Sequence, residues 1–134
     1  MNSRKTVAAE KKRNFTHNCA QAVLCSYCDL TGLDENTSLE IAGAYAAGMG
    51  NMEGTCGALI GAGMVLGTVL KDRNASVRAM KGVMAKFQQR NGATQCRLLK
   101  GTGTGKVLRE CPDCVADACE FMEEALPENT KAKL

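Results

Sequence analysis

Eight cysteines are the residues of this chain best suited to chemistry: Cys19, Cys25, Cys28, Cys56, Cys96, Cys111, Cys114 and Cys119. A chain of 134 residues buries enough apolar surface to fold without disulfide bonds. Residues 1–14 carry no apolar signal segment, so we expect the protein in the cytoplasm, where thiols stay reduced. In that compartment, a count of eight cysteines indicates metal binding or redox chemistry more than a disulfide framework.

Cys56 stands at the head of an apolar, glycine-rich run that extends to Gly67. Such a cysteine is either a buried apolar side chain or a thiolate stabilised by the start of a helix. Gly54, Gly57 and Gly61 fall within about 60° of one another on one flank of the predicted helix. Each glycine costs a helix up to about 1 kcal/mol relative to alanine. We therefore expect another backbone or a cofactor to lie close to Gly57 and Gly61.

Cys111 and Cys114 form a Cys-Pro-Asp-Cys motif at a predicted helix start. The helix dipole favours a thiolate there, and Cys111 is expected to be the more exposed sulfur. Asp113 opposes that effect by raising thiol pKa values, and the βαβ context of thioredoxin-like proteins is missing. The motif therefore fits an active dithiol, a pair of metal ligands or a structural pair.

Cys25 and Cys28 lie about 240° and 180° around the predicted first helix from Cys19. They are expected to fill the core and to be dispensable for redox activity, at a cost of about 1–2 kcal/mol each when replaced by alanine. A metal-binding or disulfide role is the alternative for this Cys-x-x-Cys pair. His17, the one histidine, either acts as a base for Cys19 or is a polar residue on the approach to the helix.

Hydrophobic periodicity, capping residues and glycine stops predict helices and almost no strands. In the second helix Ser38 is the expected N-cap, and in the fourth a stripe of Val77, Met80, Val83, Met84 and Phe87 is expected on one side. Pro112 fits the first position of the last helix. The predicted segments are 16–32, 38–48, about 54–72, 75–92 and 111–126, with a short helical turn and a glycine loop over 94–110.

These elements predict a compact all-α bundle of about five helices in a single domain. Residues 1–14 form a basic N-terminal arm or helix, residues 15–127 the cysteine-containing redox domain, and residues 128–134 a disordered tail.

Composition argues against several classes of function. Aromatic residues make up only 4% of the chain, which disfavours a nucleic-acid-binding surface, and the longest apolar run is too short for a membrane span. A single histidine argues against hydrolytic catalysis. The redox partner stays unknown, and the oligomeric state, a homodimer included, is left open.

Four stretches in this order resemble the C-GCAxxG-C-C family of small redox proteins: NCAQAV (18–23), GMGNMEGTCGALIGA (48–62), RNGATQCRLL (90–99) and CPDCVADA (111–118). The resemblance covers about residues 15–126. In the central motif, Thr55 rather than glycine precedes Cys56, and Gly57 follows it. Similar domains accompany split-Soret cytochromes, which implies electron transfer, although this chain has no Cys-x-x-Cys-His motif for covalent haem.

The resemblance implies a redox role for Cys19, Cys56, Cys96 and Cys111, with Cys114 as an alternative to Cys111. In one hypothesis these thiols exchange with disulfides, as an oxidoreductase or an electron carrier would require. In a second, they ligate an iron–sulfur cluster or a structural zinc ion. A non-catalytic helical interaction domain is the remaining alternative. Both chemical hypotheses require the four cysteines to converge in space.

Overall fold

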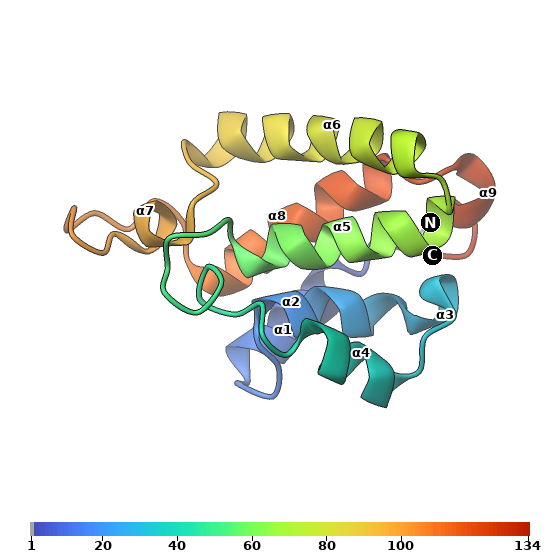
Figure 1. Cartoon of the computed structure of the whole chain (residues 1–134), viewed down its shortest axis with the longest axis horizontal. Coiled ribbons are helices and arrows are strands. Elements are labelled where there is room, and N and C mark those ends of the chain that lie inside the picture. Colours follow the sequence, from blue (N-terminus) through green and yellow to red (C-terminus); the bar gives the residue numbers. More distant parts are fainter. Residues whose placement is uncertain (1) are drawn as a thin grey trace.

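The computed structural model describes residues 2–134, and it is all-α (Figure 1). Its helices are α1 (Lys5–Arg13), α2 (Cys19–Leu24), the 3-10 turn η1 (Cys25–Tyr27), α3 (Cys28–Thr31), α4 (Glu35–Ala42), α5 (Gly57–Leu70), α6 (Arg73–Asn91), α7 (Cys96–Lys100), α8 (Cys111–Glu124) and α9 (Glu128–Lys131). In residues 2–134, β structure is limited to one isolated bridge between Thr55 and Gln95. The predicted compact all-α single domain is confirmed.

Helices α5 and α8 lie at the centre of the molecule. Helix α2 packs on α5, α1 packs on α8, and α6 covers both α5 and α8 (Figure 1). The core between them consists of small and aliphatic side chains, because the chain has few aromatic residues. Among the largest buried residues are Leu24, Tyr27, Leu59, Leu66, Phe87, Leu99 and Met122.

Two glycines of α5 allow the close packing of α2. A Cβ on Gly61 would lie 2.7 Å from the carbonyl oxygen of Ala20, and one on Gly57 would lie 2.4 Å from the carbonyl oxygen of Tyr45. Both distances are shorter than a carbon–oxygen contact allows, so only glycine fits at these positions. The expected close approach is therefore present, and the partner it brings near is backbone from α2 and the segment after α4.

Several helix boundaries differ from the sequence prediction. The predicted helix 16–32 is interrupted by η1, and α4 begins after Asp34, whose side chain caps the Thr37 N–H at 2.6 Å. Ser38 is therefore not the N-cap: it is buried within α4 and donates its hydroxyl to the Asp34 carbonyl at 2.9 Å. Helix α4 ends at Ala42 rather than near 48, and the loop that follows it adopts left-handed backbone at Ala47 and Gly48.

The remaining predictions concern the later helices and the two ends. Helix α6 ends at Asn91 and is followed by Gly92, whose left-handed backbone is the one expected of a C-terminal glycine. Val77 of the expected apolar stripe, however, is 64% exposed. Residues 2–14 contain α1, whose Ala8 and Ala9 are buried. The 128–134 segment, expected to be disordered, contains α9, and Leu134 packs against the core. Among residues 2–134, no helix is both long and apolar enough to cross a membrane.

Candidate functional site

The predicted site cysteines lie at the N-terminal ends of four helices, and these ends meet at one end of the bundle. The N-terminal ends of α2, α5 and α8 meet there beside α7 (Figure 1). A cavity of about 120 Å³ opens between them. Its lining consists of Lys12, Asn18, Cys19, Ala46, Ala47, Cys56, Gly57, Cys96, Leu99, Lys100, Cys111 and Cys114.

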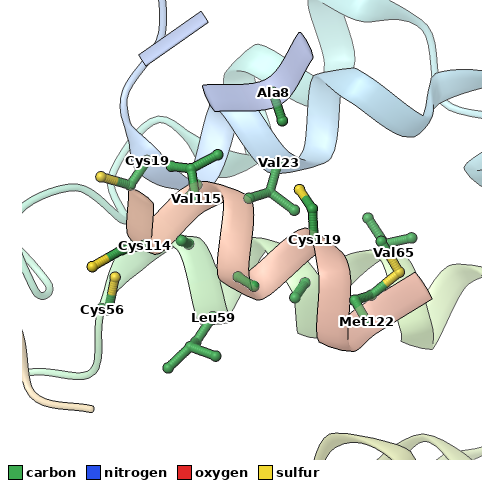
Figure 2. Close-up of a cluster of buried hydrophobic side chains, with 14 of the residues drawn as sticks. Ala8, Cys19, Val23, Cys56, Leu59, Val65, Cys114, Val115, Cys119 and Met122 are labelled. Carbon is green, nitrogen blue, oxygen red and sulfur yellow. The ribbon is translucent and has the colours of Figure 1, made fainter. Parts of the chain in front are cut away.

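The structure thus brings Cys19, Cys56, Cys96 and Cys111 together around one space, although they lie far apart in the sequence. Cys114 also lines this space, so both sulfurs of the Cys-Pro-Asp-Cys motif lie beside it. Figure 2 shows the sulfurs of Cys56 and Cys114 facing one another, with Cys19 directed to the same end. We call these five residues the cavity cysteines. Their chemical roles stay a prediction.

Backbone hydrogen bonds hold Cys56 and Cys96 beside each other. The Cys56 N–H donates to the Thr94 carbonyl at 2.8 Å, and the Cys96 N–H donates to the Gly54 carbonyl at 3.0 Å. Gly48 lies against Cys96 so closely that a Cβ there would be 2.5 Å from the Cys96 Cβ. The segment before α5 therefore packs closely against the start of α7. Several of its residues have left-handed backbone, and such backbone strain is common at functional sites.

Polar contacts fix the start of α2 and the position of α8. Asn18 and Gln21 form a reciprocal capping box at the start of α2, which sets the position of Cys19. In α8, the buried carboxylate of Asp117 accepts hydrogen bonds from Arg90 at 2.9 Å and Arg109 at 2.9 Å. These contacts tie α8 to α6 and to the segment that leads into Cys111.

Cys19 and Cys111 form the first thiol pair. Both side chains line the cavity, as do those of Lys12 and Lys100. Interaction with the Cys19 thiol and the positive charges of Lys100 and Lys12 favours the Cys111 thiolate and lowers its pKa to about 6. The same interaction, together with burial, raises the pKa of Cys19. At neutral pH, Cys111 is therefore the thiolate of the pair and Cys19 the thiol.

Cys56 and Cys114 form the second pair. Both side chains line the cavity, and Cys56 is the N-cap residue of α5. Interaction with Cys114 and with the backbone N–H groups at the start of α5 lowers the pKa of Cys56, whereas interaction with Cys56 and burial raise the pKa of Cys114. The Cys114 thiol donates a hydrogen bond to the Arg109 carbonyl oxygen at 3.8 Å. Cys56 therefore stands at a helix start, as the sequence predicts.

Cys96 is the fifth cavity cysteine, and burial raises its pKa. It faces the cavity from the first residue of α7. At neutral pH it is therefore a protonated thiol beside the Cys111 thiolate.

Cys111 is the most accessible of the cavity cysteines, and it is more exposed than Cys114, as the sequence predicts. It also lines a second cavity of about 500 Å³, which shares Lys12 and Lys100 with the first. Arg13 and Phe15, whose ring is exposed, lie along this second cavity. A molecule in this second cavity would reach Cys111 between Lys12 and Lys100, with the carboxylate of Glu110 also on the lining.

Lys12 and Lys100 are the site residues that sequence reasoning misses. Lys12 belongs to the basic helix α1, and Lys100 ends α7. Neither lies in a motif, and a lysine within a charged run is usually a solvated side chain. The basic composition of residues 4–13 was the one available signal, and it does not indicate which lysine turns inward.

The other predicted residues lie elsewhere. Gly57 lines the cavity, whereas Gly61 faces Ala20 and Val23 of α2, and a role of either glycine toward a cofactor stays a prediction. Cys25 and Cys28 do not line the cavity, in agreement with the helical angles. His17 does not line it either, and its ring pairs with Glu35 at 3.3 Å, so the geometry does not support a base for Cys19.

The family comparison agrees with the position of the site. A family model described as "Putative redox-active protein (C_GCAxxG_C_C)" matches residues 17–125. The matched range contains all five cavity cysteines and every helix that brings them together except α1. Searches of curated proteins and of solved structures found no match. Because the family model covers most of the chain, the protein belongs to the C_GCAxxG_C_C family of redox-active proteins.

Proposed function

We propose that the protein carries out thiol–disulfide exchange, with Cys111 as the attacking thiolate and Cys19 as the thiol that completes the protein disulfide. The observation that carries the proposal is that Cys19 and Cys111 line one cavity and that Cys111 also lines the second, more open one. A thiolate, a neighbouring thiol and an open approach are the requirements of this chemistry.

The first step is attack of the Cys111 thiolate on one sulfur of a substrate disulfide. An S–S bond forms between Cys111 and that sulfur, the substrate S–S bond breaks, and the other substrate sulfur leaves as a thiolate. Lys12 and Lys100 stabilise the negative charge on the attacking sulfur before the step.

The second step releases the remaining substrate sulfur. Cys19 loses its proton and attacks the Cys111 sulfur, which forms the Cys19–Cys111 disulfide and expels a second thiolate. The two departing thiolates take up two protons. One proton comes from Cys19. The other comes from solvent, which had received the proton of Cys111 when that thiol ionised. The protein loses two electrons, and the substrate disulfide gains two. The reverse sequence oxidises a substrate dithiol.

The Cys56–Cys114 pair is placed to store a second pair of electrons. It lines the same cavity, and its lowered and raised pKa values repeat the arrangement of the first pair. Because Cys56 is buried and Cys111 is not, exchange with a partner would begin at Cys111 and continue inward.

The test is the disulfide content after controlled oxidation. Treatment of the reduced protein with a small-molecule disulfide is expected to give a Cys19–Cys111 linkage in a peptide map. Cys19→Ser should stop the reaction at a mixed disulfide on Cys111, and Cys111→Ser should slow the first step strongly. Cys28→Ser is the matched control, since Cys28 lies outside the cavity. A parent protein whose cavity cysteines stay reduced, or react no faster than Cys28, would contradict the proposal.

A second candidate function is an iron–sulfur electron carrier. The observation that favours it is the number of thiols around one cavity, since four thiolates hold such clusters and five are available. Cys19, Cys56, Cys96 and Cys111 would be the ligands, with Cys114 as the alternative, and Lys12 and Lys100 would offset the negative charge. When bound, the cluster would supply one-electron transfer. The same thiolates also fit a structural zinc ion.

Anaerobic purification separates these candidates. Iron, sulfide and visible absorption in the isolated protein would select the cluster, and a colourless protein with one zinc ion would select the structural site. A colourless, metal-free protein with reactive thiols would select thiol exchange. Cys96→Ser sharpens the choice, because Cys96 belongs to no thiol pair: it should spare exchange but weaken a four-cysteine cluster.

A further inference from the structure

A second group of metal-ligand side chains lies outside the cysteine cavity. It consists of His17, Cys25 and Glu35, whose ligand atoms all lie within 4.8 Å of one another. His17 precedes α2, Cys25 begins η1, and Glu35 begins α4. None of the three lines the cysteine cavity, so the group is independent of the proposed redox site.

The ring of His17 is oriented by its neighbour. The Thr16 hydroxyl donates to the Lys11 carbonyl at 3.0 Å, and it lies 2.7 Å from Nδ1 of His17. Because a hydroxyl has one proton, Thr16 in this arrangement accepts the Nδ1–H of the ring. A neutral His17 then presents the bare lone pair of Nε2 to the Glu35 carboxylate at 3.3 Å. Two acceptors at this distance repel unless a proton or a metal cation lies between them.

Cys25 supplies the third donor. Its side chain is buried, and burial raises the pKa of the thiol to about 11, with Glu35 adding to the rise. Lys11 acts in the opposite direction and favours the thiolate. A thiol this hard to ionise becomes a thiolate when a metal ion binds it, because the metal displaces the proton.

We propose that His17, Cys25 and Glu35 form a binding site for a divalent transition metal ion, with Zn²⁺ as the ion that best suits the donors. Imidazole nitrogen, thiolate sulfur and carboxylate oxygen are all zinc ligands, and three protein ligands plus water complete a tetrahedral site. The Glu35 side chain is 57% exposed, which leaves room for that water. The contact from Thr16 is the outer hydrogen bond that metal-binding histidines usually make.

The geometry requires only a small adjustment. Zinc bonds of about 2.0–2.3 Å place tetrahedral ligands roughly 3.3–3.8 Å apart, so donors within 4.8 Å must close by about 1 Å. Glu35 can supply this movement, because it is the first residue of α4 and its carboxylate is exposed. Bound metal would then fasten α4 to the start of α2 and to η1.

The test follows His17 by nuclear magnetic resonance during a Zn²⁺ titration of the reduced full chain. His17 is the one histidine, so every imidazole nitrogen signal reports this site and none reports the cysteine cavity. We expect Nε2 to shift on metal binding while Nδ1 keeps its proton. An Nε2 signal that stays unchanged in excess Zn²⁺ would overturn the proposal.

Matched variants assign the ligands. Cys25→Ser and Glu35→Gln should weaken Zn²⁺ binding at His17 by more than tenfold, whereas Cys28→Ser and Glu40→Gln should leave it unchanged. Thr16→Val should weaken binding about 10–100-fold, as loss of an outer hydrogen bond to a ligand typically does. If Cys25→Ser does not fold, Glu35→Gln decides, because Glu35 is exposed. Equal affinities in Glu35→Gln and Glu40→Gln would overturn the assignment.

Discussion

Helix α8 carries cysteines in two contrasting settings. Cys111 and Cys114 lie in its first turn, beside the cavity and near other thiols, whereas Cys119 lies farther along, in the core. Figure 2 shows Cys119 along the same helix as Cys114, near Val23 and Val65 rather than the other labelled cysteines. Burial raises the pKa of Cys119 to about 12, while its surroundings lower the pKa of Cys111 to about 6.

The difference arises from the surroundings of the sulfur, since the residue type and the helix are the same. Cys119 is fully buried, and the nearby Glu123 adds to the cost of a negative charge, so its charged form is unfavourable. Cys111 has a thiol donor, two lysines and a helix start. A cysteine count therefore says little about reactivity until helix ends and neighbouring charges are known.

Alkylation of the folded protein tests this contrast most directly. With a pKa of about 6, Cys111 is about nine-tenths thiolate at pH 7, and it is accessible. Cys119 is fully buried and protonated. We expect Cys111 to react with iodoacetamide about a thousandfold faster or more at pH 7, since its lower intrinsic nucleophilicity offsets only part of the difference. Mass spectrometry of peptides at timed intervals measures both rates.

The pH dependence has a definite sign. Because the pKa of Cys111 is lowered, its rate should stay nearly constant above pH 7 and fall as the pH drops through about 6. A midpoint near the ordinary thiol value would show that Cys19 and the lysines do not stabilise the thiolate.

Replacement of Gly61 tests the packing that supports the cavity. In Gly61→Leu, the new side chain meets the Ala20 carbonyl, which a Cβ alone would approach to 2.7 Å. We expect a loss of about 3 kcal/mol or more in the free energy of unfolding, measured by chemical denaturation. The cavity thiols should also lose their fast alkylation, because α2 carries Cys19.

Gly67→Ala is the matched control on the same helix. A Cβ at Gly67 meets nothing within 4 Å, so alanine should stabilise the protein by up to about 1 kcal/mol through helix propensity. Equal effects of the two variants would show that α2 does not pack tightly on α5.

Part of this architecture could be predicted from the sequence. Cys56 ahead of a glycine-rich run and the Cys-Pro-Asp-Cys motif indicate thiols at helix starts, because both signals are local. The close approach at Gly61 follows from the helix-propensity cost of glycine. These signals do not say which thiols pair, because the pairing of Cys56 with Cys114 depends on how α5 and α8 pack.

Other features depend on tertiary contacts that no local pattern reports. Lys12 and Lys100 reach the cavity only because α1 packs on α8 and α7 follows α6. Asp34 takes the capping role predicted for Ser38, although both residue types are good N-caps. The 3-10 turn at Cys25 is likewise absent from the periodic pattern, and it directs Cys25 toward His17 and Glu35.

Replacement of Cys119 tests whether this sulfur serves packing alone. Cys119→Ala removes one fully buried sulfur atom from the core and should cost about 1 kcal/mol in the free energy of unfolding. The alkylation rate of Cys111 should not change. Cys28→Ala is the control, and a smaller cost is expected because Cys28 is only partly buried. A change in the Cys111 rate would mean that the core and cavity thiols are coupled.

The smallest expected effect concerns Lys100, which lines both cavities and lowers the pKa of Cys111. Lys100→Gln removes one positive charge, so the Cys111 thiolate should become less stable and its alkylation midpoint should move to higher pH. Partly exposed charge pairs contribute about 0.2–1 kcal/mol, which corresponds to a loss of thiolate of about 1.4- to fivefold below pH 6 and almost none above pH 8. Added salt should reduce the difference between parent and variant, because it screens the parent's lysine. Lys106→Gln carries the same charge change in an exposed segment outside the cysteine cavity and should leave the midpoint in place. If both variants move the midpoint equally, net charge rather than the position of Lys100 governs Cys111, and the contrast with Cys119 would rest on burial and the Cys19 thiol alone.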